Sequence, residues 1–148
     1  MLMELGHSKK LRKLAIIFWQ YKKIKMENKG KILVIDDSAT NVFLLQTLLE
    51  DYGYEVVFAY SGKEAIKHID EQDFDLLLLD IMMPEIDGYD ILDKLTRDQK
   101  IVSTPVVMVT AKEDAESQQK AMEMGAVDYI TKPVNLDKFL KVVKKYLN

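Results

Sequence analysis

Short apolar runs alternate with longer amphipathic segments from residue 31 to the end of the chain. The apolar runs predict strands at residues 32–35, 55–59, 76–79, 106–109 and 127–131. The segments between them predict helices at about 38–52, 61–71, 88–97, 114–124 and 135–147. Four consecutive leucines, Leu76–Leu79, are typical of a strand that is buried on both faces. Five strands alternating with five helices predict an α/β fold, a doubly wound (βα)5 unit with a five-stranded parallel sheet.

Local signals refine two of the predicted helices. Ser61 and Glu64 have the spacing of a capping box at the start of the second helix. On the first helix one apolar face is expected to pack on the sheet, and Phe43 is expected to point away from it. The residues of that face are Leu44, Leu45, Leu48, Leu49 and Tyr52.

Polar side chains stand where four of the five predicted strands end. Asp36 and Asp37 follow the first strand, Asp80 the third, Thr110 the fourth and Lys132 the fifth. The carboxyl ends of parallel strands meet at one edge of a sheet, and ligands bind there. Carboxylates at such close range need a compensating charge, and an oxygen-only ligand set with room for water suits Mg²⁺. One carboxylate can then act as a nucleophile on phosphorus, aided by an ammonium and a hydroxyl.

Each of these residues has an ordinary structural explanation when it is considered alone. Asp36 or Asp37 can cap a helix, Lys132 can be a solvated lysine, and Thr110 can be a strand-end hydroxyl. Because all of these residues are expected to lie at the same edge of the sheet, a functional site is favoured over these separate explanations.

Composition limits the class of protein. The 148 residues contain no cysteine, which excludes disulfides and thiolate metal sites. No apolar run reaches the roughly 20 residues needed to span a bilayer, and no secretory signal precedes the first strand, so we expect a cytoplasmic protein. The net charge of −3 is unevenly divided, because residues 1–25 carry seven Lys/Arg and one Glu, a balance of +6. Residues 26–148 therefore carry −9.

We expect a basic N-terminal extension over residues 1–28, followed by one domain over residues 29–148. Residues 9–25 favour a helix with Leu11, Leu14, Phe18 and Tyr21 on one stripe. Three interpretations stay open. The segment can contact an anionic membrane or nucleic acid, it can dock a partner, or it can have no role, with Met26 as the natural start.

The residues at the strand ends resemble the receiver domain of bacterial two-component response regulators. The resemblance rests on Asp36-Asp37, on Asp80 with the following Met-Met-Pro and Asp-Gly, on Thr110-Ala111 and on Lys132-Pro133. It covers about residues 30–147. It implies a flavodoxin-like sheet with strand order 2-1-3-4-5 and a stand-alone receiver of the chemotaxis-regulator type.

The resemblance also implies a role for each residue. Asp80 would accept a phosphoryl group from a phosphohistidine on a sensor histidine kinase or a histidine phosphotransfer protein. Asp36, Asp37 and Asp80 would bind Mg²⁺ together with the backbone carbonyl of Met82. Lys132 would pair with the phosphoryl oxygens. Beyond this Mg-dependent phosphorylation and slow autodephosphorylation, no enzymatic activity is implied.

The same resemblance implies a conformational switch. Thr110 would turn its hydroxyl to the phosphoryl group and Tyr129 would rotate inward behind it. The fourth helix, fifth strand and fifth helix would then present a changed surface to a downstream protein target. The Lys132-Pro133 bond is expected to be cis in such a protein.

Three further positions carry hypotheses of their own. Met82 and Lys112 lie two residues after Asp80 and Thr110, near the approach of hydrolytic water. Because Met82 cannot orient that water by a hydrogen bond, we expect a long-lived phosphorylated state. An exposed Phe43 is either an isolated apolar residue or part of the surface on which the phosphodonor docks.

Three other functions are alternatives to the receiver. A haloacid-dehalogenase-like phosphatase would need a second Asp at the position of Met82. A flavodoxin-like FMN carrier would need a phosphate-binding loop in place of Asp36-Asp37. A receiver-fold docking module that works without phosphorylation is a further alternative. The acidic body argues against direct nucleic-acid binding.

Overall fold

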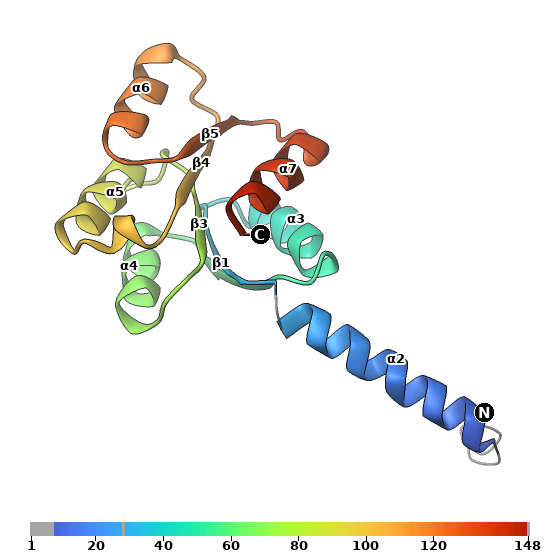
Figure 1. The fold of residues 1–148 in the computed structure, drawn as a ribbon. Helices are drawn as coiled ribbons and strands as arrows, with labels where there is room; N and C mark the ends of the chain where they lie inside the picture. Colours follow the sequence, from blue (N-terminus) through green and yellow to red (C-terminus); the bar gives the residue numbers. More distant parts are fainter. Residues whose placement is uncertain (1–7, 28, 148) are drawn as a thin grey trace.

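A single parallel sheet forms the centre of the protein, seen here in a computed structural model that describes residues 8–27 and 29–147. Its five strands lie in the order β2-β1-β3-β4-β5, and every neighbouring pair is parallel. Both the parallel sheet and the strand order implied by the resemblance are confirmed (Figure 1). The strands are β1 (Lys31–Ile35), β2 (Glu55–Ala59), β3 (Leu76–Leu79), β4 (Val106–Thr110) and β5 (Asp128–Thr131).

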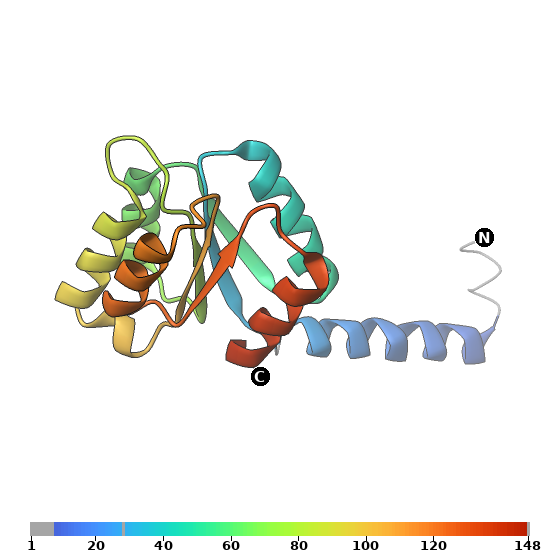
Figure 2. The same ribbon diagram turned by 90° about the horizontal axis from the view of Figure 1, so that it is seen from above.

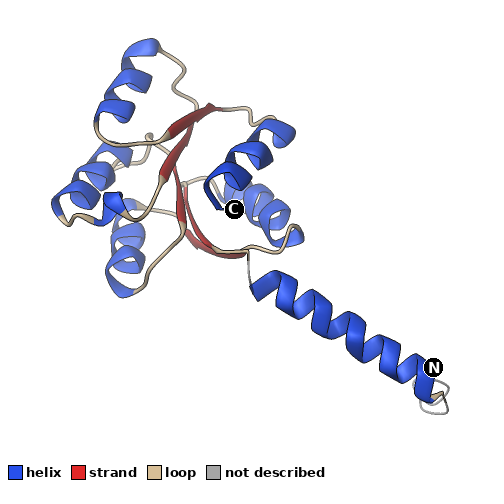
Figure 3. Cartoon of the chain, in the orientation of Figure 1, coloured by secondary structure: helices blue, strands red, loops and turns tan. Residues whose placement is uncertain are grey.

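Helices cover both faces of this sheet (Figure 3). One face packs against α3 (Ala39–Asp51) and α7 (Leu136–Leu147), and the other against α4 (Gly62–Glu71), α5 (Gly88–Arg97) and α6 (Ala115–Glu123). A short 3-10 helix, η1 (Lys100–Val102), leads into β4 and was not predicted from the sequence. The doubly wound architecture follows from this two-sided cover.

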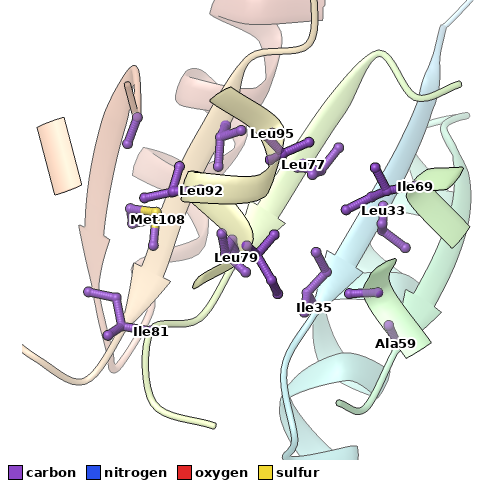
Figure 4. Close-up of a cluster of buried hydrophobic side chains, with 14 of the residues drawn as sticks. Leu33, Ile35, Ala59, Ile69, Leu77, Leu79, Ile81, Leu92, Leu95 and Met108 are labelled. Atoms are coloured by element: carbon purple, nitrogen blue, oxygen red, sulfur yellow. The ribbon is translucent and has the colours of Figure 1, made fainter. Parts of the chain in front are cut away.

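The leucine strand β3 lies in the middle of the sheet and joins the two apolar cores. Leu77 and Leu79 pack toward α4 and α5, whereas Leu76 and Leu78 pack toward α3 and α7. All four are buried, because successive side chains of a strand point to opposite faces and both faces are covered. Figure 4 shows Leu77 and Leu79 among side chains of the neighbouring strands and of α5.

The predicted capping box at the start of α4 is only half present. The Ser61 hydroxyl accepts from the backbone amide of Glu64, as predicted. The Glu64 carboxylate, however, accepts from the amide of Tyr60, one residue further back than the box requires. The reciprocal box occurs at α5 instead, where Asp87 and Asp90 each accept from the backbone amide of the other.

The predicted packing face of α3 needs a correction. The buried residues are Val42, Leu45 and Leu49, an i, i+3, i+7 series that faces β1 and β3. Leu44 is 47% exposed and lies beside Phe43, which is 70% exposed. The apolar stripe is therefore rotated by about one residue from the predicted one, and two adjacent apolar side chains face solvent.

Helix α2 (Lys9–Glu27) precedes the sheet and extends away from it (Figures 1 and 2). The expected helix at residues 9–25 is thus confirmed and is slightly longer. Every side chain from Lys9 to Lys23 is exposed. Among the helices of residues 8–27 and 29–147, none is both long and apolar enough to cross a bilayer.

Candidate functional site

The register of the sheet places Asp36 and Asp80 next to each other. Ile35 and Leu79 are partners in the parallel pairing of β1 with β3, so the residue that follows each strand is an aspartate. The amide of Asp80 donates to the carbonyl of Ile35 at 3.0 Å, and the amide of Asp36 donates to that of Ala59 at 3.1 Å. The two carboxylates are thus positioned by the sheet itself rather than by a loop.

Three carboxylates meet at this edge. One oxygen from each of Asp36, Asp37 and Asp80 lies within 4.8 Å of the other two. Asp36 is 3% exposed and Asp80 is 5% exposed, whereas Asp37 faces solvent. This is a set of hard oxygen donors that is closed on one side and open to water on the other, which fits the coordination of Mg²⁺.

The Lys132 ammonium lies between the two buried carboxylates. Its Nζ is 2.6 Å from Oδ2 of Asp36 and 3.1 Å from Oδ2 of Asp80. Burial alone lowers the pKa of Lys132, but the hydrogen bond from Asp36 and the charges of Asp80 and Asp36 raise it by more. The pKa therefore lies above its ordinary value, and the ammonium stays protonated at neutral pH.

Each buried carboxylate is held at both of its oxygens. Oδ2 of both residues faces Lys132, while Oδ1 accepts from a backbone amide two residues further along the chain. For Asp36 that amide belongs to Ser38, at 2.9 Å, and for Asp80 it belongs to Met82, at 3.2 Å. These hydrogen bonds fix the orientation of both side chains.

The end of β5 is attached to the end of β4. The amide of Lys132 donates to the carbonyl of Thr110 at 2.8 Å, and the Lys132–Pro133 peptide bond is cis. The Thr110 side chain is fully buried, and its hydroxyl accepts from the amide of Lys112 at 3.4 Å. The predicted hydroxyl thus lies at the same sheet edge as the carboxylates.

Tyr129 is partly buried on β5 and contacts the same loop. Its hydroxyl donates to the backbone carbonyl of Lys112 at 2.5 Å. Burial raises the pKa of Tyr129 to about 12, and the negative charges of Asp114 and Asp80 and the ring of Tyr89 add to the shift. Thr110 and Tyr129 are therefore linked through the backbone of one residue, because one binds the amide of Lys112 and the other its carbonyl. Sequence reasoning noted Lys112 for its side chain and missed this backbone link.

A cavity of about 410 Å³ opens beside Asp80. Its lining residues are Ile81, Met82, Met83, Pro84, Asp87, Tyr89 and Lys112. The loop after β3 folds back tightly here, since a Cβ on Gly88 would lie 2.5 Å from the carbonyl oxygen of Asp80.

Tyr89, which sequence reasoning also missed, lines this cavity. Its hydroxyl donates a hydrogen bond to the carbonyl of Ser117 on α6 at 3.3 Å. An aromatic residue just after the Asp-Gly pair was the available signal.

Comparison with known proteins gives a consistent result. The family model for the response regulator receiver domain matches residues 32–144. The chain is 44% identical over 103 residues to the alkaline phosphatase synthesis transcriptional regulatory protein PhoP of Bacillus subtilis, covering 70% of this chain and 42% of PhoP. It is 33% identical over 118 residues to PilH of Pseudomonas aeruginosa, covering 80% of this chain and 98% of PilH. The transcriptional regulators that it matches are longer, and the chain spans 26% to 55% of them.

Solved structures show the same fold. The chemotaxis protein CheY4 of Vibrio cholerae superimposes with a TM-score of 0.75 at 30% identity, covering 80% of this chain and 98% of that one. The response regulator TrrA of Thermotoga maritima, solved in complex with Mg²⁺-BeF, gives a TM-score of 0.71 at 32% identity, covering 79% and 98%.

Proposed function

The chain belongs to the response regulator receiver family, and we propose that it acts as a phosphoacceptor switch in which Asp80 is the phosphorylated residue. The observation that carries the proposal is the setting of Asp80. Its buried carboxylate lies beside two further carboxylates and within 3.1 Å of one ammonium. A nucleophile that meets an anionic phosphoryl group needs this balance of charge.

The proposed reaction is transfer of a phosphoryl group from a phosphohistidine. A carboxylate oxygen of Asp80 attacks phosphorus while the P–N bond to the imidazole breaks. The bonding electrons stay on the imidazole nitrogen, which takes a proton from water, and Asp80 becomes an acyl phosphate. Hydrolysis by one water molecule returns the carboxylate and releases inorganic phosphate.

Asp36, Asp37 and Asp80 are the residues that would hold Mg²⁺, together with the backbone carbonyl of Met82 that the family resemblance implies. The ion would neutralise charge on the phosphoryl oxygens. The Mg²⁺-BeF complex of the related TrrA supports this assignment. The described cluster, closed by Asp36 and Asp80 and open at Asp37, is compatible with an ion that keeps several waters.

The remaining site residues recognise the phosphoryl group and transmit its presence. Lys132 already points between Asp36 and Asp80 and would pair with a phosphoryl oxygen. The Thr110 hydroxyl would turn toward the same group and give up its contact with the Lys112 amide. Because Tyr129 binds the carbonyl of Lys112, that movement would reach β5. The surface of α6, β5 and α7 would change with it.

Receiver domains of two-component systems interact with histidine kinases. For this chain we propose a sensor histidine kinase or a histidine phosphotransfer protein as donor, and a protein target on the surface of α6, β5 and α7. The acidic body, with a charge of −9 over residues 26–148, disfavours nucleic acid as a direct target. A phosphatase of the haloacid-dehalogenase type gains no support, since Met82 offers no acid two residues after Asp80.

Intact mass measurement tests the proposal. Wild-type protein incubated with phosphoramidate or acetyl phosphate is expected to gain one phosphoryl group in the presence of Mg²⁺ and none in EDTA. Asp80→Asn is expected to gain none, and Asp93→Asn, an exposed acid of α5, is the matched control that behaves as wild type. A folded wild type without an adduct from both donors would make the chain a phosphorylation-independent docking module instead.

A further inference from the structure

Helix α2 carries an exposed apolar face. Leu11, Leu14, Ile17, Phe18 and Tyr21 fall within about 120° of a helical wheel drawn at 100° per residue. Leu11, Leu14, Ile17 and Phe18 are 50% to 60% exposed, so the described body of the protein does not cover them. Lys10 also falls within this arc, and an exposed apolar face on a helix indicates an interaction surface.

The same helix is strongly basic. Seven Lys/Arg and no acidic residue lie between Lys9 and Met26. Lys9, Arg12 and Lys23 fall opposite the apolar face on the wheel. Two ammonium groups also lie over aromatic rings one turn earlier in the helix, with Lys22 5.1 Å from the ring centre of Phe18 and Lys23 5.2 Å from that of Trp19.

We propose that α2 binds the surface of an anionic membrane. The helix lies in the plane of the interface, with the face around Leu14 and Phe18 in the acyl boundary and the lysines among the headgroups. Anionic lipid satisfies both features at once, because it takes up apolar side chains on one side and cations on the other. Trp19, which is 62% exposed, falls on the basic side of the wheel with Arg12 and Lys23.

Two other occupants fit the helix less well. Leu11, Leu14, Phe18 and Tyr21 have coiled-coil spacing, but the flanking positions hold Lys10 and Lys22 with no acid to pair with them. Two copies of α2 would therefore bring like charges together. Nucleic acid would neutralise the lysines but leave the apolar face in water.

The rest of the protein is compatible with this arrangement. The body carries −9 over residues 26–148 and would be repelled by an anionic surface. Because α2 extends away from the sheet, the helix can lie on the membrane while the body stays off it (Figure 2). The inference does not depend on the chemistry of Asp80 and would stand if that chemistry failed.

The test uses the full chain and large vesicles, either pure phosphatidylcholine or one-quarter phosphatidylglycerol. We expect co-sedimentation with the anionic vesicles, with affinity about tenfold or more above that for neutral vesicles. High salt should weaken the binding.

Matched variants locate the contact. Leu14→Gln is expected to weaken binding by about tenfold, because it removes one buried side chain from the apolar face. Ile16→Gln, with similar exposure but on the basic side, is expected to leave the affinity unchanged.

The proposal is overturned if wild type stays in the supernatant of anionic vesicles, or if both variants weaken binding equally. An α2-dependent dimer in sedimentation velocity, or binding to DNA with an affinity equal to that for anionic vesicles, would overturn it in favour of those occupants.

Discussion

The Tyr129 hydroxyl donates a 2.5 Å hydrogen bond to the backbone carbonyl of Lys112. The amide of the same residue donates to the Thr110 hydroxyl, so one short segment after β4 connects a buried hydroxyl at the site with a ring on β5. In the proposed switch, a change at Thr110 alters the position of Lys112 and thereby the partner of Tyr129.

Tyr129 is expected to make stability sensitive to alkaline pH. Burial raises its pKa to about 12, against 10.0 for an ordinary tyrosine. Between these values the folded protein binds more protons than the unfolded chain, so this contribution to stability is complete below pH 10.0 and is lost as the pH rises toward 12. Denaturant unfolding at several pH values should show a steeper alkaline loss for wild type than for Tyr129→Phe. Equal slopes in this range would contradict the prediction.

Tyr129→Phe is also expected to leave phosphorylation of Asp80 intact while weakening its effect on the surface of α6, β5 and α7. The phenol is absent from the carboxylate cluster but binds the loop that moves. Amide exchange in β5 and α6, with and without the phosphoryl group, is the measurement. A full wild-type response in the variant would remove Tyr129 from the switch.

Loss of the Lys132 ammonium should destabilise the metal-free protein. Lys132→Met leaves the buried carboxylates of Asp36 and Asp80 without their cation, and we expect the free energy of unfolding in EDTA to fall by about 3 kcal/mol. Lys138→Met, an exposed lysine of α7, is the matched control. Because the pKa of Lys132 is raised, the difference between wild type and Lys132→Met should hold through neutral pH and shrink above pH 10.5. A stability equal to that of the control would contradict the assignment.

Met82 is expected to prolong the phosphorylated state. It is exposed and lines the cavity beside Asp80, where it has no group to orient water for attack on phosphorus. Met82→Asn should shorten the lifetime of the phosphoryl group several-fold, measured as the decay of the adduct mass after removal of the donor. Met122→Asn, an exposed methionine of α6, should not. Decay within seconds in wild type and no change in Met82→Asn would refute this role.

Phe43 offers a test of donor docking. The ring is 70% exposed near the start of α3, next to the exposed Leu44, and α3 begins directly after the acidic site. Phe43→Ala should slow phosphotransfer from the cognate phosphohistidine protein by about tenfold, as expected for an aromatic anchor. Acetyl phosphate should react with the variant as fast as with wild type. Val102→Ala, at the opposite edge of the sheet, is the control, and equal transfer rates in the two variants would leave Phe43 as an isolated apolar residue.

The fold was predictable because its signals are local. Four leucines in a row leave few alternatives to a strand buried on both faces, and Ser38, Ser61, Asp87 and Asp114 each cap a helix close to the predicted start. The cluster of Asp36, Asp37 and Asp80 was predictable for the same reason, since all three lie within two residues of the end of a strand in a parallel sheet.

Features that depend on packing were not predictable. The rotation of α3, which exposes Leu44 and buries Val42, is set by how the helix meets β1 and β3. The Glu64 carboxylate accepts from the amide of Tyr60 and not from that of Ser61. The spacing of Ser61 and Glu64 in the sequence does not distinguish these two neighbouring amides. The link through the backbone of Lys112 is invisible in sequence, because it depends on peptide atoms that every residue has.

The most direct test identifies the phosphorylated residue. Protein treated with phosphoramidate and Mg²⁺ is reduced with borohydride, which converts an acyl phosphate of aspartate to homoserine, and is then mapped by peptide mass spectrometry. We predict one modified position, Asp80. Modification at Asp36 or Asp37 instead, or none in a protein that has gained the mass of a phosphoryl group, would contradict the assignment of Asp80 as the acceptor.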